Sequence, residues 1–254
     1  MKIVLTGSEG FIGSHLKKKL LKKEHQLICY DLVLNKNIKN FTLNGDENFV
    51  IHLAAKANVR DSVKNPEPYF LNNVEYSKKI FDLCYEKKIP CLYASSSSVH
   101  NWTLSPYGES KKKMEEAARP GQVGLRFATT YGEKPRKGML FDYIVNSTVK
   151  YKTNHKRDFI YIDDVVNAIL LFVKLGLKDK NKTYEVSSGH LYKVKEVIEE
   201  AGFKVPLRKG EDCEAESNAS DNSELRKLGW KPTMSVWDFL RNLDLNKAST
   251  FDSL

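Results

Sequence analysis

Three glycines at three-residue intervals follow the first apolar run of this chain. Residues 2–6 read Lys-Ile-Val-Leu-Thr, Gly7, Gly10 and Gly13 come directly after them, and a helical pattern covers residues 14–23. Glycines at a strand-to-helix turn let the backbone approach a pyrophosphate, whose charge then meets the unpaired amide groups at the start of the helix. The pattern predicts a dinucleotide-binding unit, although a tight turn that needs glycine only for close packing would give the same spacing.

A carboxylate at the end of the second predicted strand favours the first of these readings. Residues 26–30 are a second apolar run, and Asp31 ends it at close to the spacing from Gly13, about 20 residues, that is expected of a dinucleotide-binding unit. Such a carboxylate accepts both ribose hydroxyls of adenosine and repels a 2′-phosphate. An Asp in an ordinary turn is common, so it is the joint placement of Asp31 and the glycines that predicts NAD rather than NADP.

Strands and helices alternate along the first half of the chain. Further strands are predicted at residues 48–53, 91–94 and 123–127, with helices at 68–86 and 107–118. Alternation of this kind is typical of a parallel sheet with right-handed crossovers. We therefore predict an α/β fold, a Rossmann-like doubly wound parallel sheet with a small C-terminal substrate-binding subdomain.

The division into these two parts follows from the pattern of elements. Beyond residue 157 the chain reads as a strand at 159–162, a helix at 165–175 and a strand at 182–186, and it becomes more polar from residue 189 on. We assign residues 1–133 and 156–187 to the NAD-binding core. We assign residues 134–155 and 188–254 to the substrate-binding subdomain.

The composition is that of a globular protein. Of the 254 residues, 41% are hydrophobic and 29% charged, which argues against a disordered, collagen-like or disulfide-stapled chain. No apolar stretch approaches the roughly 18 residues of a membrane span, and the apolar run at the N-terminus is too short for a signal peptide. We therefore expect no membrane association and a cytoplasmic location.

The cysteines indicate neither a disulfide nor a metal site. The residues concerned, Cys29, Cys84, Cys91 and Cys213, are scattered, without a Cys/His spacing typical of zinc ligands. We expect reduced thiols, most of them buried.

The formal net charge of +9 suits an anionic partner, which can be nucleic acid, a membrane surface or a phosphorylated small ligand. The densest basic run, residues 17–23, has its two leucines among lysines, as in an amphipathic helix with a solvated lysine face. No aromatic residue that could stack on a base is interleaved there. We therefore expect no nucleic-acid partner.

A tyrosine and a lysine four residues apart begin the predicted helix at residues 107–118. Tyr107 and Lys111 lie on one face of that helix and can share a site. A phenol with a pKa near ~10 is a poor base at neutral pH, and we expect the adjacent ammonium to lower that pKa. The pair is suited to taking a proton from an alcohol while a hydride leaves, although an exposed helix face would show the same spacing.

Several motifs in collinear order resemble the extended short-chain dehydrogenase/reductases, specifically the nucleotide-sugar epimerase/dehydratase group. The resemblance reaches from residue 1 to about residue 243. The segments that carry it are Thr6 to Leu16, His52 to Ala55, Asn65 to Tyr69, Asn72 to Val74, Ser105 to Lys111, Leu125 to Gly132, Arg157 to Val165 and Leu228 to Pro232.

The resemblance implies a role for each matching residue. Tyr107 is expected to be the catalytic base, Ser96 the catalytic hydroxyl, and Lys111 the residue that binds the nicotinamide ribose. Arg157 is expected to hold a substrate phosphate. The remaining substrate-binding residues implied are Ser96, Thr129, Arg208 and Glu211, and the cofactor-binding ones are Gly7, Gly10, Phe11, Ile12, Gly13, Asp31, Leu53, Ala54, Ala55, Tyr107 and Lys111.

The function implied is that of an NAD-dependent nucleotide-sugar epimerase, which oxidises C4 of a nucleoside-diphosphate sugar transiently. Dehydratases of the group carry an acid pair, usually Asp-Glu, directly after the catalytic hydroxyl, and Ser97 and Ser98 stand there instead. A keto-sugar reductase, a dehydratase and a non-catalytic NAD-binding protein of this fold remain alternatives. Relatives often pair through the two helices expected at 68–86 and 107–118, so a homodimer is expected.

The chain also departs from the family pattern. Too few residues separate Asp31 from His52 for the usual third helix, which predicts a trimmed adenine side. The stretch between Ser96 and Tyr107 is short, and Ala128 and Thr129 stand where Phe-Asn is common. We expect an open substrate pocket.

Overall fold

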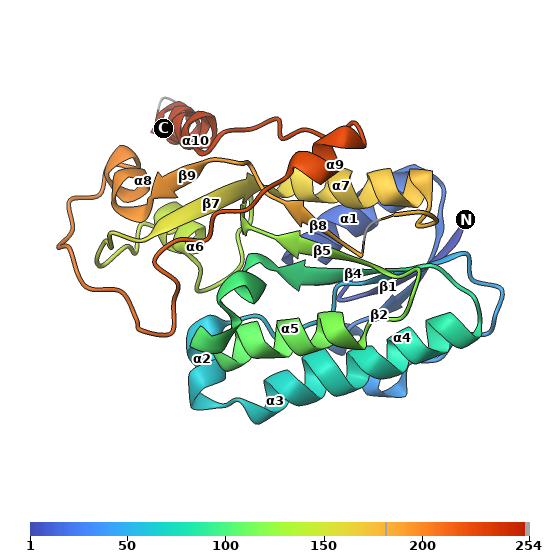
Figure 1. The fold of residues 1–254 in the computed structure, drawn as a ribbon. Helices are drawn as coiled ribbons and strands as arrows, with labels where there is room; N and C mark the ends of the chain where they lie inside the picture. The colour runs from blue at the N-terminus through green and yellow to red at the C-terminus, as the bar shows by residue number, and fades with distance from the viewer. Residues whose placement is uncertain (181, 252–254) are drawn as a thin grey trace.

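The computed structural model describes residues 1–180 and 182–251. A six-stranded sheet runs through its middle, and every neighbouring pair of strands is parallel (Figure 1). This confirms the predicted doubly wound fold class. The strands, in the order in which they lie side by side, are β2 (Gln26–Tyr30), β1 (Lys2–Thr6), β3 (Phe49–His52), β4 (Cys91–Ser96), β5 (Val123–Phe127) and β8 (Thr183–Val186).

The strand order creates a crevice beside β1. The chain passes from β1 outward to β2 and then returns to β3 on the other side of β1. At such a reversal the connections leave the sheet in opposite directions, so a crevice opens at the carboxyl ends of the strands.

Helices cover both faces of this sheet (Figure 1). On one face, α1 (Phe11–Lys22) and α7 (Ile162–Leu175) pack over a core that includes Ile3, Leu16 and Ile169. On the other face, α4 (Ser77–Glu86) and α5 (Pro106–Ala117) pack over a second core that includes Phe81. Because both faces are covered, the strands read as nearly continuous apolar runs in the sequence.

The helix predicted at residues 68–86 contains a π-helical segment. It runs as α3 (Glu67–Phe70), the π-helical segment η3 (Leu71–Tyr76) and then α4. Within η3, Asn73 is fully buried, and its side chain bonds both the N–H and the C=O of Lys56 and the hydroxyl of Ser110. These bonds tie the segment that follows β3 to α5.

The adenine side is trimmed, as the sequence predicts. Between Asp31 and Phe49 the chain forms only two short 3₁₀ turns, η1 (Leu32–Leu34) and η2 (Ile38–Asn40). The other short elements of this half of the chain are α2 (Val59–Lys64) and the kinked 3₁₀ segment η4 (Ser97–Leu104).

A second, three-stranded sheet packs beside the first. It consists of β6 (Thr129–Tyr131), β7 (Lys156–Tyr161) and β9 (Leu191–Lys193), with β7 in the centre. A third apolar core, rich in aromatic rings, lies under it. The helices of this half are α6 (Leu140–Val145), α8 (Val194–Glu200), α9 (Ser223–Lys227) and α10 (Val236–Phe251). The sheet joins strands from both predicted parts of the chain, whose exact division stays a prediction.

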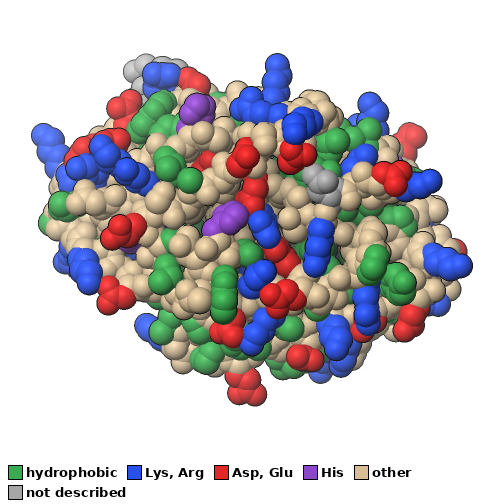
Figure 2. Space-filling view, in the orientation of Figure 1, with side chains coloured by type: hydrophobic (Ala, Val, Ile, Leu, Met, Phe, Trp, Pro, Cys, Tyr) green, Lys and Arg blue, Asp and Glu red, His purple; other side chains and the backbone are tan. Residues whose placement is uncertain are grey.

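The surface in Figure 2 shows basic side chains interspersed with acidic ones rather than gathered in one patch. None of the helices within residues 1–180 and 182–251 is long and apolar enough to cross a membrane.

A buried carboxylate joins the tail to the start of α7. Asp164 is fully buried, and its oxygens accept from the backbone N–H of Thr233 at 2.9 Å and from its hydroxyl at 2.7 Å. The indole N–H of Trp230 donates to the Asp164 carbonyl at 3.0 Å. The preceding Asp163 is half exposed and pairs with Lys19.

This pair of neighbours gives a matched test of the fold. We expect Asp164→Asn to lower the free energy of unfolding by about 2 kcal/mol, because buried hydrogen bonds to a charged group are lost. Asp163→Asn removes the same charge from the surface and should change it by less than about 0.5 kcal/mol. Urea unfolding of both variants measures the difference, and equal effects would contradict the role assigned to Asp164.

Candidate functional site

A cavity of about 950 Å³ opens at the carboxyl ends of β1, β3, β4 and β5, where the strand order creates the crevice. Large, largely preformed cavities of this kind are the usual location of a ligand. One side is lined by the turn after β1 and by residues that follow β3. The opposite wall comes from residues 136–159 and from the tail segment 213–218.

The glycine turn is a cradle that no side chain could share. Gly7 has a φ of 70°, and a Cβ there would lie 2.7 Å from the Ala54 nitrogen. A Cβ on Gly13 would lie 1.9 Å from the Gly7 oxygen, and one on Gly10 would lie 3.3 Å from it. All three glycines line the cavity at the start of α1, where free amides and the helix dipole favour a pyrophosphate. The turn therefore fits a dinucleotide.

The other predicted cofactor residues surround this cradle. Phe11, Ile12, Leu53 and Ala55 line the cavity. Ala54 instead donates its N–H to the Thr6 hydroxyl at 3.1 Å, which joins the ends of β1 and β3.

Asp31 is tied to the glycine turn by its carboxylate. Its two oxygens accept from the backbone N–H groups of Glu9 and Val33, each at 3.0 Å. The residue lies outside the cavity lining, so its contact with a ribose stays a prediction.

Ser96, Tyr107 and Lys111 come together on one side of the cavity. Ser96 ends β4, and Tyr107 lies in the first turn of α5, which Ser105 caps by accepting from the Gly108 N–H at 3.1 Å. The Ser96 hydroxyl donates to the Ser98 hydroxyl at 3.2 Å and lies close enough to the Tyr107 phenol to affect its pKa. Lys111 lies one turn further along α5, and its ammonium donates to the Ala94 carbonyl at 2.8 Å.

The expected lowering of the Tyr107 pKa is wrong for this arrangement. Burial raises the pKa of the phenol above its ordinary value, and the Ser96 hydroxyl and the charge of Arg136 offset that effect only in part. Burial also lowers the pKa of Lys111 to about 7, against the opposing charge of Glu115. Desolvation is the largest effect on the pKa of both groups, because the protein encloses each side chain.

The substrate residues predicted from the family divide into two groups. Thr129 and Arg157 line the cavity. Arg157 donates to the Ala215 carbonyl at 2.7 Å and lies 3.7 Å from Glu214, so it pairs with the tail rather than with Asp163 or Asp164.

Arg208 and Glu211 lie outside the lining, and both are exposed. The Arg208 guanidinium instead lies 5.4 Å from the ring of Tyr151. Their contact with a nucleotide stays a prediction.

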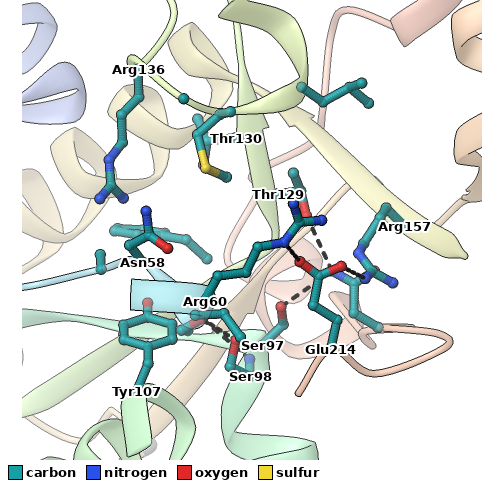
Figure 3. A pocket seen from close by; sticks show the side chains of 18 of the residues that line it. Asn58, Arg60, Ser97, Ser98, Tyr107, Thr129, Thr130, Arg136, Arg157 and Glu214 are labelled. Carbon is teal, nitrogen blue, oxygen red and sulfur yellow. Dashed lines mark hydrogen bonds and ion pairs between the residues drawn. The ribbon is translucent and has the colours of Figure 1, made fainter. Parts of the chain in front are cut away.

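Several polar residues of the cavity were not predicted from the sequence. Among them are Arg60, Asn58, Arg136 and Glu214, and Figure 3 shows these four facing the space between Tyr107 and Arg157. Asn58 caps α2 and Arg60 is the second residue of that helix, for which no element was predicted. The position of this segment directly after β3 is the signal that could have indicated Arg60 and Asn58.

Comparison with known proteins identifies the family and supports the fold. A model of the NAD dependent epimerase/dehydratase family matches residues 3–187. Protein CapI of Staphylococcus aureus is 36% identical over an alignment that covers 68% of this chain and 70% of that relative.

Two solved structures share the fold. A mutant UDP-glucuronic acid 4-epimerase from Bacillus cereus, in complex with UDP-4-deoxy-4-fluoro-glucuronic acid and NAD, is 25% identical with a TM-score of 0.83 and covers 94% of this chain and 96% of its own. MoeE5 in complex with UDP-glucose and NAD is 23% identical with a TM-score of 0.84, and the match covers 98% of this chain and 100% of MoeE5. This chain belongs to the NAD-dependent epimerase/dehydratase family.

Proposed function

We propose that this protein is an NAD-dependent 4-epimerase of a nucleoside-diphosphate sugar. The observation that carries the proposal is the convergence of Ser96, Tyr107 and Lys111 beside a glycine cradle that fits a dinucleotide. NAD, when bound there, would accept a hydride from C4 of the sugar and return it.

Side chains of the protein would carry out the proton transfer. The Tyr107 oxygen would take the proton of the sugar 4-hydroxyl, and the Ser96 hydroxyl, which lies near Tyr107, would hold the same sugar oxygen. Lys111 lies one helical turn from Tyr107, and its lowered pKa lets it gain or lose a proton near neutral pH.

The polar groups near Tyr107 favour epimerisation over dehydration. Dehydration needs an acid beside the catalytic hydroxyl, and the neutral Ser97 and Ser98 line that position. Among the described lining residues, carboxylates occur only at Asp61 and Glu214. Asp61 accepts from the Tyr69 hydroxyl at 2.9 Å, and Glu214 pairs with Arg60. A reductase or dehydratase of the same family is the alternative.

Arg136 supports a sugar that carries a carboxylate. Its charge acts on both Tyr107 and Lys111, and its guanidinium points toward Asn58 and Tyr107 in Figure 3. Neither lining carboxylate of the described residues pairs with Arg136. A guanidinium can bind a carboxylate through two parallel hydrogen bonds. We therefore propose that the sugar of the substrate is a uronate, which carries a carboxylate. The B. cereus structure, whose ligand is such a sugar, supports this choice.

A cytoplasmic homodimer is part of the proposal. The cysteines are free thiols, as in a reducing compartment. The helices α4 and α5 lie side by side on the outer surface (Figure 1). The adjoining segment η3 exposes Leu71, and α5 carries charged pairs such as Lys113 with Glu109, a face that could meet its copy about a two-fold axis.

The experiment that tests the reaction is incubation with UDP-, GDP- and dTDP-sugars, with products identified by mass and NMR. We expect Tyr107→Phe to lower turnover by about 10²-fold or more while NAD binding and folding are retained, because the positioned base is lost. Tyr85→Phe, which changes an exposed tyrosine of α4, should leave turnover unchanged. A fully active Tyr107→Phe protein would remove Tyr107 from the mechanism.

The sugar class is tested at Arg136. We expect Arg136→Gln to lower kcat/KM for UDP-glucuronate by about 10- to 100-fold more than kcat/KM for UDP-glucose, the scale of a lost charge-assisted pair, because the effect of its charge on Tyr107 and Lys111 is common to both sugars. Lys137→Gln removes a neighbouring charge from outside the lining and is the matched control. Equal losses with both sugars would rule out recognition of the carboxylate by Arg136.

The state of Lys111 is tested by the pH dependence of stability. Its pKa falls from 10.5 in the unfolded chain to about 7 in the fold, so between these values the unfolded chain binds this proton more tightly. The lysine therefore destabilises the fold fully below pH 7, and the cost disappears as the pH rises toward 10.5. In protein without NAD, Lys111→Met should unfold at a higher urea concentration than wild type at pH 7. The difference between the two unfolding midpoints should become smaller toward pH 10. Lys112→Met should show no such trend, and a margin independent of pH would contradict burial of the ammonium.

A further inference from the structure

Three basic side chains converge on one carboxylate in the wall of the cavity. The Glu214 oxygens lie 2.7 Å from Arg60 Nε, 3.4 Å from His155 Nδ1 and 3.7 Å from Arg157 Nη2. All four residues line the cavity. Figure 3 shows Glu214 between Arg60 and Arg157.

The basic residues come from two separate parts of the fold. Arg60 is the second residue of α2, just after the main sheet, whereas His155 and Arg157 stand at the start of β7 in the second sheet. Glu214 comes from the tail segment 213–218, which lines the cavity together with them. The carboxylate therefore links both halves of the cavity wall.

The charges of this group do not balance. Burial lowers the pKa of Arg157 and that of His155. Burial also disfavours the charged form of Arg60, but its hydrogen bonds to Glu214 and Tyr151 outweigh this and raise its pKa. A guanidinium keeps its proton in proteins, so two fixed positive charges face a single carboxylate. An anion with two charges would neutralise the pair more completely.

We propose that Glu214 is an internal competitor for the diphosphate of the substrate, holding the same basic residues and giving them up when the nucleotide sugar binds. This deepens the proposed function, since it assigns Arg60, His155 and Arg157 to the diphosphate and Glu214 to the control of their access. The side chain is tethered beside its partners, so its effective concentration is in the millimolar range or above. Anions that bind weakly therefore do not displace Glu214 from the basic residues. The apparent affinity for a diphosphate is lowered as well, because the site is free only for the fraction of time that Glu214 does not occupy these residues.

The backbone that carries Glu214 is anchored independently of its side chain. Lys156 of β7 donates its N–H to the Glu216 carbonyl at 2.8 Å. Four residues beyond Glu214, the Asn218 amide donates to the hydroxyls of Ser97 at 3.4 Å and Thr129 at 3.3 Å, and its oxygen accepts from the Asp158 N–H at 2.7 Å. The Glu214 side chain can therefore release its partners while this segment stays in place.

Binding of inorganic pyrophosphate and of UDP, measured by isothermal titration calorimetry, tests the proposal without any turnover. We expect Glu214→Gln to bind both about 5- to 10-fold more tightly than wild type, because the competing charge is removed. Asp212→Asn makes the same charge change two residues away, at an exposed side chain that pairs with Lys209, and should bind like wild type. Unchanged or weaker binding by Glu214→Gln would overturn the proposal, as would the absence of binding by every form at 10 mM.

Thermal unfolding separates competition from a merely structural contact. Without an anion, Glu214→Gln should melt below wild type because Arg60 and Arg157 lose their counter-charge, and pyrophosphate should raise its melting temperature more than that of wild type. If pyrophosphate raised the melting temperature of Glu214→Gln no more than that of wild type, the result would contradict the proposal. If Glu214→Gln fails to fold, Glu214→Asp decides, since a shorter carboxylate cannot reach all three partners and should also tighten pyrophosphate binding. Tighter pyrophosphate binding with no epimerised product from any sugar would leave this inference standing and reject the proposed reaction.

Discussion

The close approach of two backbone segments, the turn after β1 and the chain leaving β3, sets the geometry of the whole site. Gly7 lies against the backbone of Leu53 and Ala54 with no room for a Cβ. The Thr6 hydroxyl fixes this contact by accepting from the Ala54 N–H and bonding to His52 at 2.7 Å, and His52 in turn bonds Ser77 of α4 at 2.8 Å. Burial lowers the pKa of His52 to about 3, so it is a neutral link. The start of α1 is thereby held against the cavity.

A second buried network supports the strand that carries Ser96. Glu115 of α5 accepts from the Ser95 hydroxyl and from two nitrogens of Arg126, and Arg126 also reaches Glu185 of β8 at 3.1 Å. His100 of η4 donates to the same Glu185 at 2.9 Å when Nε2 carries its proton. Side chains from α5, β4, β5, β8 and η4 are thus joined, and the bonds among Glu115, Arg126 and Glu185 are costly to break because these three charges are largely removed from water. Ser96 and Tyr107 are positioned by this network as well as by the backbone.

Local patterns were enough to predict the core of the fold and part of the site. The strands at 2–6, 26–30 and 123–127 have the predicted bounds, because buried parallel strands leave an apolar run in the sequence. The glycine turn and the placement of Tyr107 and Lys111 on one helix also follow from spacing alone. The pairing of Arg60 with Glu214 joins residues 154 positions apart, and no periodicity encodes such a contact. The direction in which the pKa of Tyr107 shifts could not be predicted either, since it depends on how completely other elements enclose the ring.

The π-helical segment η3 holds one residue more than a regular α-helix would place between α3 and α4. A π-turn is a local bulge, so it takes up the extra residue while the residues on either side keep the faces of a continuous helix. Deletion of one residue from Leu71–Tyr76 would therefore leave Ile80, Phe81 and Cys84 facing the sheet that buries them. Deletion of one residue from the first turn of α4 would instead rotate these side chains by about 100° about the helix axis, so η3 is the place where this helix tolerates a change of length.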